Sequence, residues 1–546
     1  MRRSAPPLIG PLIGLLLVTT AVLASPPVPL AGAPKSVLFL VIDDFRPELS
    51  TAYGQRGIVT PNLDKFAQSA LTFGHAYVQF AHCSPSRNSF LSGRSPQTTQ
   101  VYNFVEHFRE VGQNWTALPQ FFKENGFYTA GGGKVYHPNL PPNNDPPSWD
   151  EYFFANGDDR GCKQGDSLFD KVCPSDEDDS AFYDCNLVAE TVAQLKKAKA
   201  QAKPFFIAAG LRRPHLAFHA PRRFYDMYAN NGTFPDDMPL AKHKKGPVGM
   251  PELAFYSDIG PGVHPWPSVP WNYTSPVPDH IAALARWGYY ASVSFMDSNV
   301  GIVLDALDDL QLAEDTVVVF MGDHGWQLGE HGEWGKHTNF ELALRVPLMV
   351  RSPAHPKSAG ARAPHFVESL DLYRTLAGLV LPGATVEAGV EGTDLSPIFE
   401  DPTATLETAA FSQMSRCPQN NSWINNPCNF VPLKQITYMG YTVRVTGWRY
   451  TVWLAFNGTT NRALWDGPMH GEELYDHTGD GGADFDAFEN ANAVNASGNQ
   501  LIRNKLLAAL RTRFDTPPGN KTMSLVADHA PPPIIGPLQQ VKIIKS

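Results

Sequence analysis

Residues 36–44 read SVLFLVIDD, an apolar run that ends in two aspartates. A run this short is typical of a buried strand in a parallel sheet, because such strands are covered on both faces. In open α/β sheets, ligands bind beyond the carboxyl ends of the strands. The stretch therefore predicts a central strand that carries Asp43 and Asp44 to the functional edge of the sheet.

Three later stretches also combine a short apolar run with charged or histidine side chains at its end. They are FYTAGGGKVYH (127–137), PFFIAAGLRRPH (204–215) and TVVVFMGDHG (316–325). Their polar ends supply Lys134 and His137, then Arg212, Arg213 and His215, and finally Asp323 and His324. We therefore expect four parallel strands to deliver polar groups to one edge of the sheet.

Helical patterns alternate with these strands. Residues 60–73, TPNLDKFAQSALTF, place apolar side chains on one helical face with Pro61 near the start. A longer helical pattern runs from about residue 279 to residue 312. Strands that alternate with helices predict an α/β sandwich with a mostly parallel central sheet, here over residues 35–405.

The pattern changes after residue 405. Residues 436–458, ITYMGYTVRVTGWRYTVWLAFNG, are short runs rich in Tyr, Val, Trp and Thr, which are typical of an antiparallel sheet. A helix is expected at about 499–514. Residues 406–516 therefore read as a smaller C-terminal α+β subdomain, and the proline-rich residues 517–546 as a tail.

The charged residues at the predicted sheet edge favour a metal site. At a strand end the backbone turns, so Asp43 and Asp44 can reach one ion, and Asp323 can add a third carboxylate. Carboxylate oxygens suit calcium or magnesium, whereas the nitrogen of His324 suits zinc better. The alternative is that these side chains only cap loops or remain solvated.

Four basic or histidine side chains at or near the same edge indicate an anion-binding pocket. They are Lys134, His137, His215 and Lys336, the last within the glycine-rich stretch GEHGEWGKHTNF (329–340). Each is a weak signal alone, since a single histidine is more often structural. Their common location beside a cation site predicts a pocket for an anionic group.

Residues 81–94, AHCSPSRNSFLSGR, contain an isolated cysteine at the apparent start of a helix. Pro85 suits a first helical turn, and Arg87 would lie one turn beyond Cys83 on the same face. A helix N-terminus attracts anions. Two other interpretations of Cys83 remain, a buried free cysteine and a thiolate nucleophile.

The charge of the chain bears on the kind of partner that it can bind. A net charge of -10 argues against a nucleic-acid partner.

Residues 1–24 combine an arginine pair, an apolar stretch and a small-residue exit, which predicts a cleaved signal peptide rather than an uncleaved anchor. No later segment is long enough for stable membrane insertion. Asn-x-Ser/Thr sites begin at residues 114, 231, 272, 420, 457, 495 and 520, which favours a glycosylated protein of the secretory pathway.

Six cysteines stand at positions 83, 162, 173, 185, 417 and 428. An oxidising compartment encourages close neighbours to pair, so Cys417 and Cys428 are expected to form a disulfide. Among Cys162, Cys173 and Cys185 one is left over, and the spacing does not say which.

The stretch CSPSR followed by SGR resembles the signature of the cysteine-type sulfatases, in which Ser92 replaces the usual threonine. The resemblance extends through VIDDFRP, FKENGFYTAGGGKVYHP and GDHGWQLGEHGEWGKHTNFELALRVPL. Within the family these segments are most similar to the iduronate-2-sulfatase branch, which shares the pair at Asp323 and His324. The resemblance implies an alkaline-phosphatase-like fold.

The resemblance also implies a modified nucleophile and a metal ion. Cys83 would be oxidised to formylglycine by a formylglycine-generating enzyme during secretion, and its hydrated aldehyde would be the nucleophile. One calcium ion would be bound by this group together with Asp43, Asp44, Asp323 and His324.

Roles for the remaining candidates follow from the same resemblance. Arg87 would steady the formylglycine, and Lys134 and Lys336 would hold the sulfate oxygens. His137 would help the sulfated intermediate to break down, and His215 would protonate the leaving alcohol.

The expected activity is hydrolysis of a sulfated saccharide, in particular a terminal uronate 2-sulfate of a glycosaminoglycan or related polysaccharide, in a lysosomal or extracellular setting. Residues 141–184 and 234–278 show little that matches the branch, and His337 stands where a tyrosine is expected. The alternatives are a phosphodiesterase or phosphonate hydrolase of the same superfamily, and an inactive carbohydrate-binding relative.

Overall fold

A computed structural model describes residues 36–138, 144–157, 171–229, 238–256, 272–404, 406, 409–418 and 428–515. Several expectations lie outside these residues: the leader 1–24, Cys162, the tail 517–546 and the glycosylation sites at Asn231, Asn420 and Asn520.

An eight-stranded sheet forms the centre of the molecule, in the order β12-β2-β11-β8-β1-β6-β3-β4. Its strands are β1 (Ser36–Ile42), β2 (Leu71–Tyr77), β3 (Tyr128–Gly133), β4 (Glu151–Phe153), β6 (Phe205–Leu211), β8 (Thr316–Gly322), β11 (Arg345–Arg351) and β12 (Arg362–Glu368). Only β11 runs antiparallel to its neighbours among these strands. The four strands expected from the sequence are adjacent and parallel, in the order β8-β1-β6-β3, so the mostly parallel sheet is confirmed.

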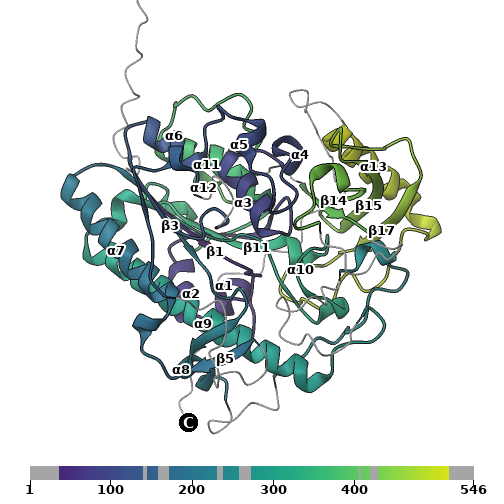
Figure 1. Cartoon of the computed structure of the whole chain (residues 1–546), viewed down its shortest axis with the longest axis horizontal. Helices are drawn as coiled ribbons and strands as arrows, with labels where there is room; N and C mark the ends of the chain where they lie inside the picture. Colours follow the sequence, from purple (N-terminus) through teal and green to yellow (C-terminus); the bar gives the residue numbers. More distant parts are fainter. Residues whose placement is uncertain are drawn as a thin grey trace, which may run out of the picture.

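Helices cover both faces of this sheet (Figure 1). Alternate side chains of β1 enter two different cores, because successive residues of a strand point to opposite faces. Val37, Phe39 and Val41 pack with helices α3 (Cys83–Ser92), α6 (Leu118–Glu124) and α11 (Leu372–Val380). Leu38, Leu40 and Ile42 pack with α2 (Pro61–Ala67), α7 (Tyr183–Gln201) and α9 (Asp279–Asp309). β1 is therefore buried on both faces, which explains its continuous apolar sequence.

The helix expected at 60–73 is only half correct. Helix α2 ends at Ala67, and Leu71 begins strand β2, which pairs with β11 and β12. Ala70 and Leu71 continue the helical spacing of Leu63, Phe66 and Ala67, but pairing of β2 with two strands from much later in the chain decides the outcome. The long helical pattern is confirmed as α9.

The C-terminal part forms a second, antiparallel sheet, seen at the right of Figure 1. It contains β13 (Ala410–Arg416), β14 (Tyr438–Val445), β15 (Trp448–Asn457), β16 (Arg462–Ala463) and β17 (Met469–Asp476). Helix α13 (Gln500–Asp515) packs on it, with the rings of Phe514 and Tyr441 4.5 Å apart. The expected antiparallel sheet and its helix are thus confirmed.

Shorter elements complete the described chain. The helices are α1 (Ser50–Tyr53), α4 (Pro96–Thr99), α5 (Phe108–Val111), α8 (Arg222–Asp226), α10 (Glu341–Leu344) and α12 (Ser396–Glu400), and the strands are β5 (Val172–Ser175), β7 (Phe218–Pro221), β9 (Gln327–Leu328) and β10 (Trp334–Gly335). Within the described ranges, no helix is both long and apolar enough to cross a membrane.

The cysteines pair largely as expected. Cys417 and Cys428 form a disulfide with Cα atoms 5.4 Å apart. Cys173 is also disulfide-bonded, and Cys185 carries a free thiol. The structure therefore identifies Cys185 as the cysteine left over from its group of three.

Candidate active site

Neighbouring strands end at the same level and bring their polar residues together. Ile42 of β1 is in register with Leu211 of β6 and Gly322 of β8. Asp44 then adopts a left-handed backbone conformation, with φ of 58°, which is uncommon for a residue other than glycine. The chain leaves the extended conformation at this point, so the side chains of Asp43 and Asp44 both reach the site.

Cys83 is the first residue of α3 and is 1% exposed. Pro85 lies in the first turn, as expected, and Gly93 ends the helix with φ of 66°. The glycine of the SGR sequence is therefore needed for the left-handed helix end. This helix holds Cys83 facing the ends of β1 and β8.

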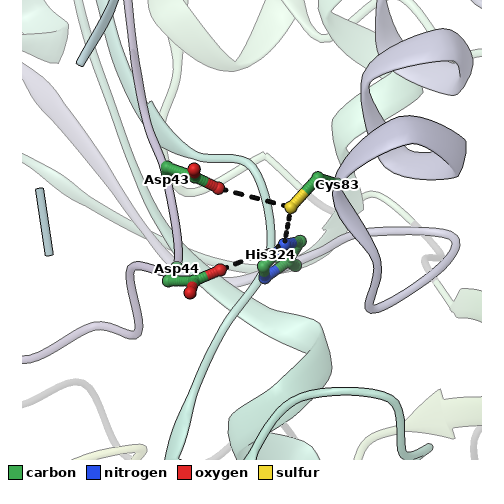
Figure 2. Close-up of side chains that lie close together, drawn as sticks. All are labelled: Asp43, Asp44, Cys83 and His324. Atoms are coloured by element: carbon green, nitrogen blue, oxygen red, sulfur yellow. Dashed lines mark hydrogen bonds and ion pairs between the residues drawn. The ribbon is translucent and has the colours of Figure 1, made fainter. Parts of the chain in front are cut away.

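Four side chains form a group that fits a metal ion: Asp43, Asp44, Cys83 and His324 (Figure 2). One potential ligand atom from each lies within 4.8 Å of all the others. Cys83 Sγ is 3.4 Å from Asp43 Oδ1 and 3.2 Å from His324 Nε2. Asp44 Oδ2 is buried and has no hydrogen-bond partner in the described structure. Because a buried carboxylate oxygen without a partner is costly, this donor set suits a bound cation.

Asp323 and Arg87 form a buried pair beside this group. Arg87 Nη2 lies 2.9 Å from Asp323 Oδ2 and 3.5 Å from Asp43 Oδ1. Asp323 Oδ1 accepts hydrogen bonds from the backbone N–H groups of Asp44 and His324. Arg87 therefore holds the acidic side chains in place.

Both predicted lysines lie against Cys83 and are buried. The ammonium of Lys134 is 3.4 Å from Sγ and donates to Asp43. The ammonium of Lys336 is 3.1 Å from Sγ and donates to Asp44. Two positive charges therefore converge on the side chain at position 83.

Both predicted histidines line a pocket of about 280 Å³ that opens above Cys83. His215 Nδ1 is 2.6 Å from the carbonyl oxygen of Leu216, and its Nε2 lies 3.9 Å from Asp44 Oδ2. His137 packs on the ring of Phe104, with centroids 4.4 Å apart. Its Nδ1 has no hydrogen-bond partner among the described residues. The two rings are thus available to groups that enter the pocket.

The surroundings shift the acidity of these groups strongly. Burial raises the pKa of the Cys83 thiol to about 12, and the negative charge of Asp43 adds to this effect. Burial also raises the pKa of Asp44 to about 6 and that of Asp323 to about 7, in spite of the nearby Lys336 and Arg87. Burial works in the same direction on Asp43, but Lys134 and the other cations hold its pKa well below the usual value. A thiol with so high a pKa is a poor thiolate nucleophile.

Histidine acidity is shifted in the opposite direction. Burial, together with Lys134, lowers the pKa of His137 to about 2. Burial also lowers the pKa of His215 and His324 well below the usual value. All three rings are therefore neutral in the absence of an anion, and a neutral ring can accept a proton or bind a metal.

The structure brings together every site residue expected from the sequence and adds pocket-lining residues that were missed. These include Phe104, Lys171, Trp326, Asn429 and Phe430. Only Trp326 carried a sequence signal, since it follows His324 by two residues. The others come from loops distant in the chain, and no local pattern marks them.

Comparisons with known proteins agree with this geometry. A profile described as Sulfatase matches residues 35–382. The chain is 34% identical to iduronate 2-sulfatase of Mus musculus over 507 residues, covering 81% of this chain and 88% of the mouse protein. A solved 2-O GAG sulfatase superposes with a TM-score of 0.64 at 21% identity, covering 88% of this chain and 93% of that one. Phosphonate monoester hydrolase of Agrobacterium radiobacter superposes with a TM-score of 0.66 at 18% identity, covering 88% of this chain and 96% of that one.

A parallel sheet whose edge gathers carboxylates, lysines and histidines around one buried cysteine defines an ester hydrolase of the alkaline-phosphatase-like fold. Because the family profile covers well over half of the chain, the chain belongs to the sulfatase family. It is an enzyme that hydrolyses sulfate esters.

Proposed function

We propose that the protein removes sulfate from a terminal uronate 2-sulfate of a glycosaminoglycan or a related polysaccharide, with formylglycine made from Cys83 as the nucleophile. The convergence of Lys134, Lys336 and the metal-fitting acids on this one side chain carries the proposal. A thiol with a pKa near 12 stays protonated at neutral pH, so it carries no negative charge for these cations to stabilise. A hydrated aldehyde at the same position would place oxygen atoms beside both cations.

Calcium is the ion that we propose for the site, held by Asp43, Asp44, Asp323, His324 and the modified Cys83. The oxygen-rich donor set and the unpartnered Asp44 Oδ2 support a hard cation. When bound, calcium would supply positive charge that favours ionisation of a coordinated hydroxyl group. Arg87 keeps two of the acids in place and balances part of their charge.

The first half of the reaction transfers the sulfuryl group to residue 83. Lys134 and Lys336 would bind sulfate oxygens and stabilise the charge that develops there. One hydroxyl of the hydrated aldehyde would lose its proton to the solvent and attack sulfur, and the bond from sulfur to the sugar oxygen would break. His215 would give its proton to that oxygen. The negative charge of a bound sulfate ester favours the protonated ring that this step requires.

The second half releases sulfate and restores the aldehyde. The remaining hydroxyl of residue 83 would lose its proton to His137 and become the aldehyde oxygen. The bond from the carbon of residue 83 to the sulfated oxygen would break, so that sulfate leaves with that oxygen. A base must be neutral before it accepts a proton, and the lowered pKa of His137 keeps its ring neutral. Water would then hydrate the aldehyde for the next turnover.

The substrate and the setting are the finer parts of this proposal. Similarity to iduronate 2-sulfatase over most of both chains supports a uronate 2-sulfate. The predicted leader and the disulfides support a lysosomal or extracellular setting, which would also expose the chain to a formylglycine-generating enzyme.

The decisive experiment is mass analysis of the peptide that contains residue 83, in protein from its native secretory pathway, together with turnover of an aryl sulfate and an aryl phosphate. We expect the mass of formylglycine and a strong preference for sulfate. An unmodified thiol in active enzyme would overturn the mechanism. Preference for the phosphate would favour the phosphohydrolase alternative, whose fold is closely similar.

A further inference from the structure

The mouth of the active-site pocket carries an exposed aromatic side chain. Phe430 is 76% exposed, yet it lines the same pocket as Cys83 and His215. Its ring lies 5.6 Å from that of Phe104, which in turn contacts His137. The two phenylalanines therefore form an aromatic platform, defined here as Phe104 and Phe430, that leads from the solvent to the catalytic side chains.

The loop that carries Phe430 is held on both sides of this residue. The disulfide between the buried Cys417 and Cys428 ends two residues before it. The backbone N–H of Phe104 donates to the carbonyl oxygen of Asn429 at 3.0 Å. The side chain of Asn103 donates to the carbonyl oxygen of Val431 at 2.7 Å. An exposed ring on a fixed backbone is preorganised for contact with a ligand.

The same pocket contains a positive charge that no described acid neutralises. Lys171, which precedes β5, lines the pocket and makes no ion pair with any described residue. Lys134 and Lys336, in contrast, each pair with an aspartate at the bottom of the pocket. Lys171 is therefore available to an anionic group separate from the sulfate that is cleaved.

We propose that Phe430 and Phe104 stack on the ring of the sulfated saccharide, and that Lys171 pairs with a second anionic group on that saccharide. This inference rests on the proposed saccharide substrate and adds the residues that select it. The second group is a uronate carboxylate or another sulfate, both of which attract an ammonium ion. Phe430 lies beyond the residues that match the family profile, so substrate selection would come partly from the C-terminal part of the chain.

The test compares kcat/KM of the wild type and its variants on three compounds: a methyl 2-O-sulfo-uronide, the methyl ester of its carboxylate, which keeps only the charge of the sulfate, and a methyl hexoside sulfated at positions 2 and 6. Phe430→Ala should lower kcat/KM about tenfold on all three, mainly through KM, because stacking acts on the bound ground state and the transition state alike. Phe430→Trp should restore most of the loss. Phe154→Ala is the matched control, since Phe154 is also a highly exposed phenylalanine, at 77%, and lies outside the pocket.

Lys171→Gln should lower kcat/KM about tenfold on a compound that carries a second anionic group and leave the methyl ester, which has none, unchanged. A loss confined to the uronide identifies a carboxylate, and a loss confined to the disulfated hexoside identifies a sulfate. Equal losses on all three compounds would overturn the role of Lys171. A Phe430→Ala variant that behaves like Phe154→Ala would overturn the platform. A wild type that hydrolyses an aryl sulfate but none of the saccharides would instead refute the proposed substrate class.

Discussion

Two buried clusters of this protein contain the same kinds of residue but differ in what surrounds them. The first is the active-site group of Asp43, Asp44, Cys83 and His324. The second is the group of Glu341, His477 and Glu489, whose ligand atoms also lie within 4.8 Å of one another. We call it the structural cluster, because it joins α10 to the loops that follow the C-terminal sheet.

Arginines satisfy the acids of the structural cluster. Glu341 pairs with Arg444 at 3.1 Å and also contacts Arg449, which lies 2.6 Å from Glu489. The cavity beside this cluster is about 10 Å³, enough for about one water molecule. The active site instead combines an unpartnered carboxylate oxygen with a pocket of about 280 Å³.

The pKa values express the same difference. In the active site, burial raises the pKa of Asp44 to about 6. Beside the structural cluster, burial also acts to raise the pKa of Asp480, but His477 and Arg444 outweigh it and lower the value to about 2. Acids and a histidine in contact are therefore not enough to define a metal site. Saturation by arginine marks a structural role, and incomplete pairing marks a site that accepts a ligand.

The largest expected effect follows from removing the proposed nucleophile. Cys83→Ala should lower sulfatase turnover by more than about 10⁴-fold, because no covalent intermediate can form. The melting temperature should change little. Turnover of an aryl sulfate measures the effect, and Cys185→Ala is the matched control because Cys185 is also a free cysteine. Activity retained by the Cys83 variant would contradict the proposed mechanism.

The metal content should distinguish the two clusters. We propose one calcium ion per chain, and Asp44→Asn should reduce this content and lower turnover about 10³-fold, because a metal-fitting carboxylate is lost. Glu489→Gln, the matched change in the structural cluster, should leave the calcium content unchanged. Elemental analysis of purified protein measures both. Calcium loss in the Glu489 variant would mean that the structural cluster also binds metal.

The free energy of unfolding should distinguish the two clusters in the opposite sense from the calcium content, because it should fall when the structural cluster is changed. Glu341→Ala should lower the free energy of unfolding by about 3–5 kcal/mol, because Arg444 and Arg449 lose a shared buried partner. Denaturant unfolding measures this loss, and turnover by the remaining folded enzyme should be close to wild type. Asp176→Ala, which removes the exposed partner of Arg222, should cost at most about 1 kcal/mol. Equal losses of unfolding free energy in the two variants would contradict a structural role for the cluster.

The smallest expected effect is a pH dependence of stability. The folded pKa of Asp480 is lowered to about 2 from an ordinary value of 3.8. Its ionised form therefore stabilises the fold above about pH 4, and this contribution is lost as the pH falls toward 2. A shift of this size corresponds to about 2 kcal/mol. Acid unfolding of Asp480→Asn should show a weaker pH dependence in this window, and an unchanged dependence would contradict the assignment.

Local sequence patterns were sufficient for the strands that build the active site. Short apolar runs predicted β1, β3, β6 and β8, and the polar ends of these runs predicted which side chains would meet. The helix expected at 60–73 was partly wrong because Ala70 and Leu71 fit the helical spacing, although Leu71 begins a strand. Pairing of β2 with β11 and β12 decided it.

The amino-acid sequence by itself determined the parallel sheet, the helix start at Cys83, the candidate metal and catalytic residues, and the family resemblance. These depend on runs, caps and short motifs, whose physical causes act over a few neighbouring residues. Only the tertiary structure decided that Cys185 stays unpaired, that arginines saturate the structural cluster, and that Phe430 reaches the pocket of Cys83. Each of these depends on contacts between segments far apart in the chain, which a local pattern does not encode.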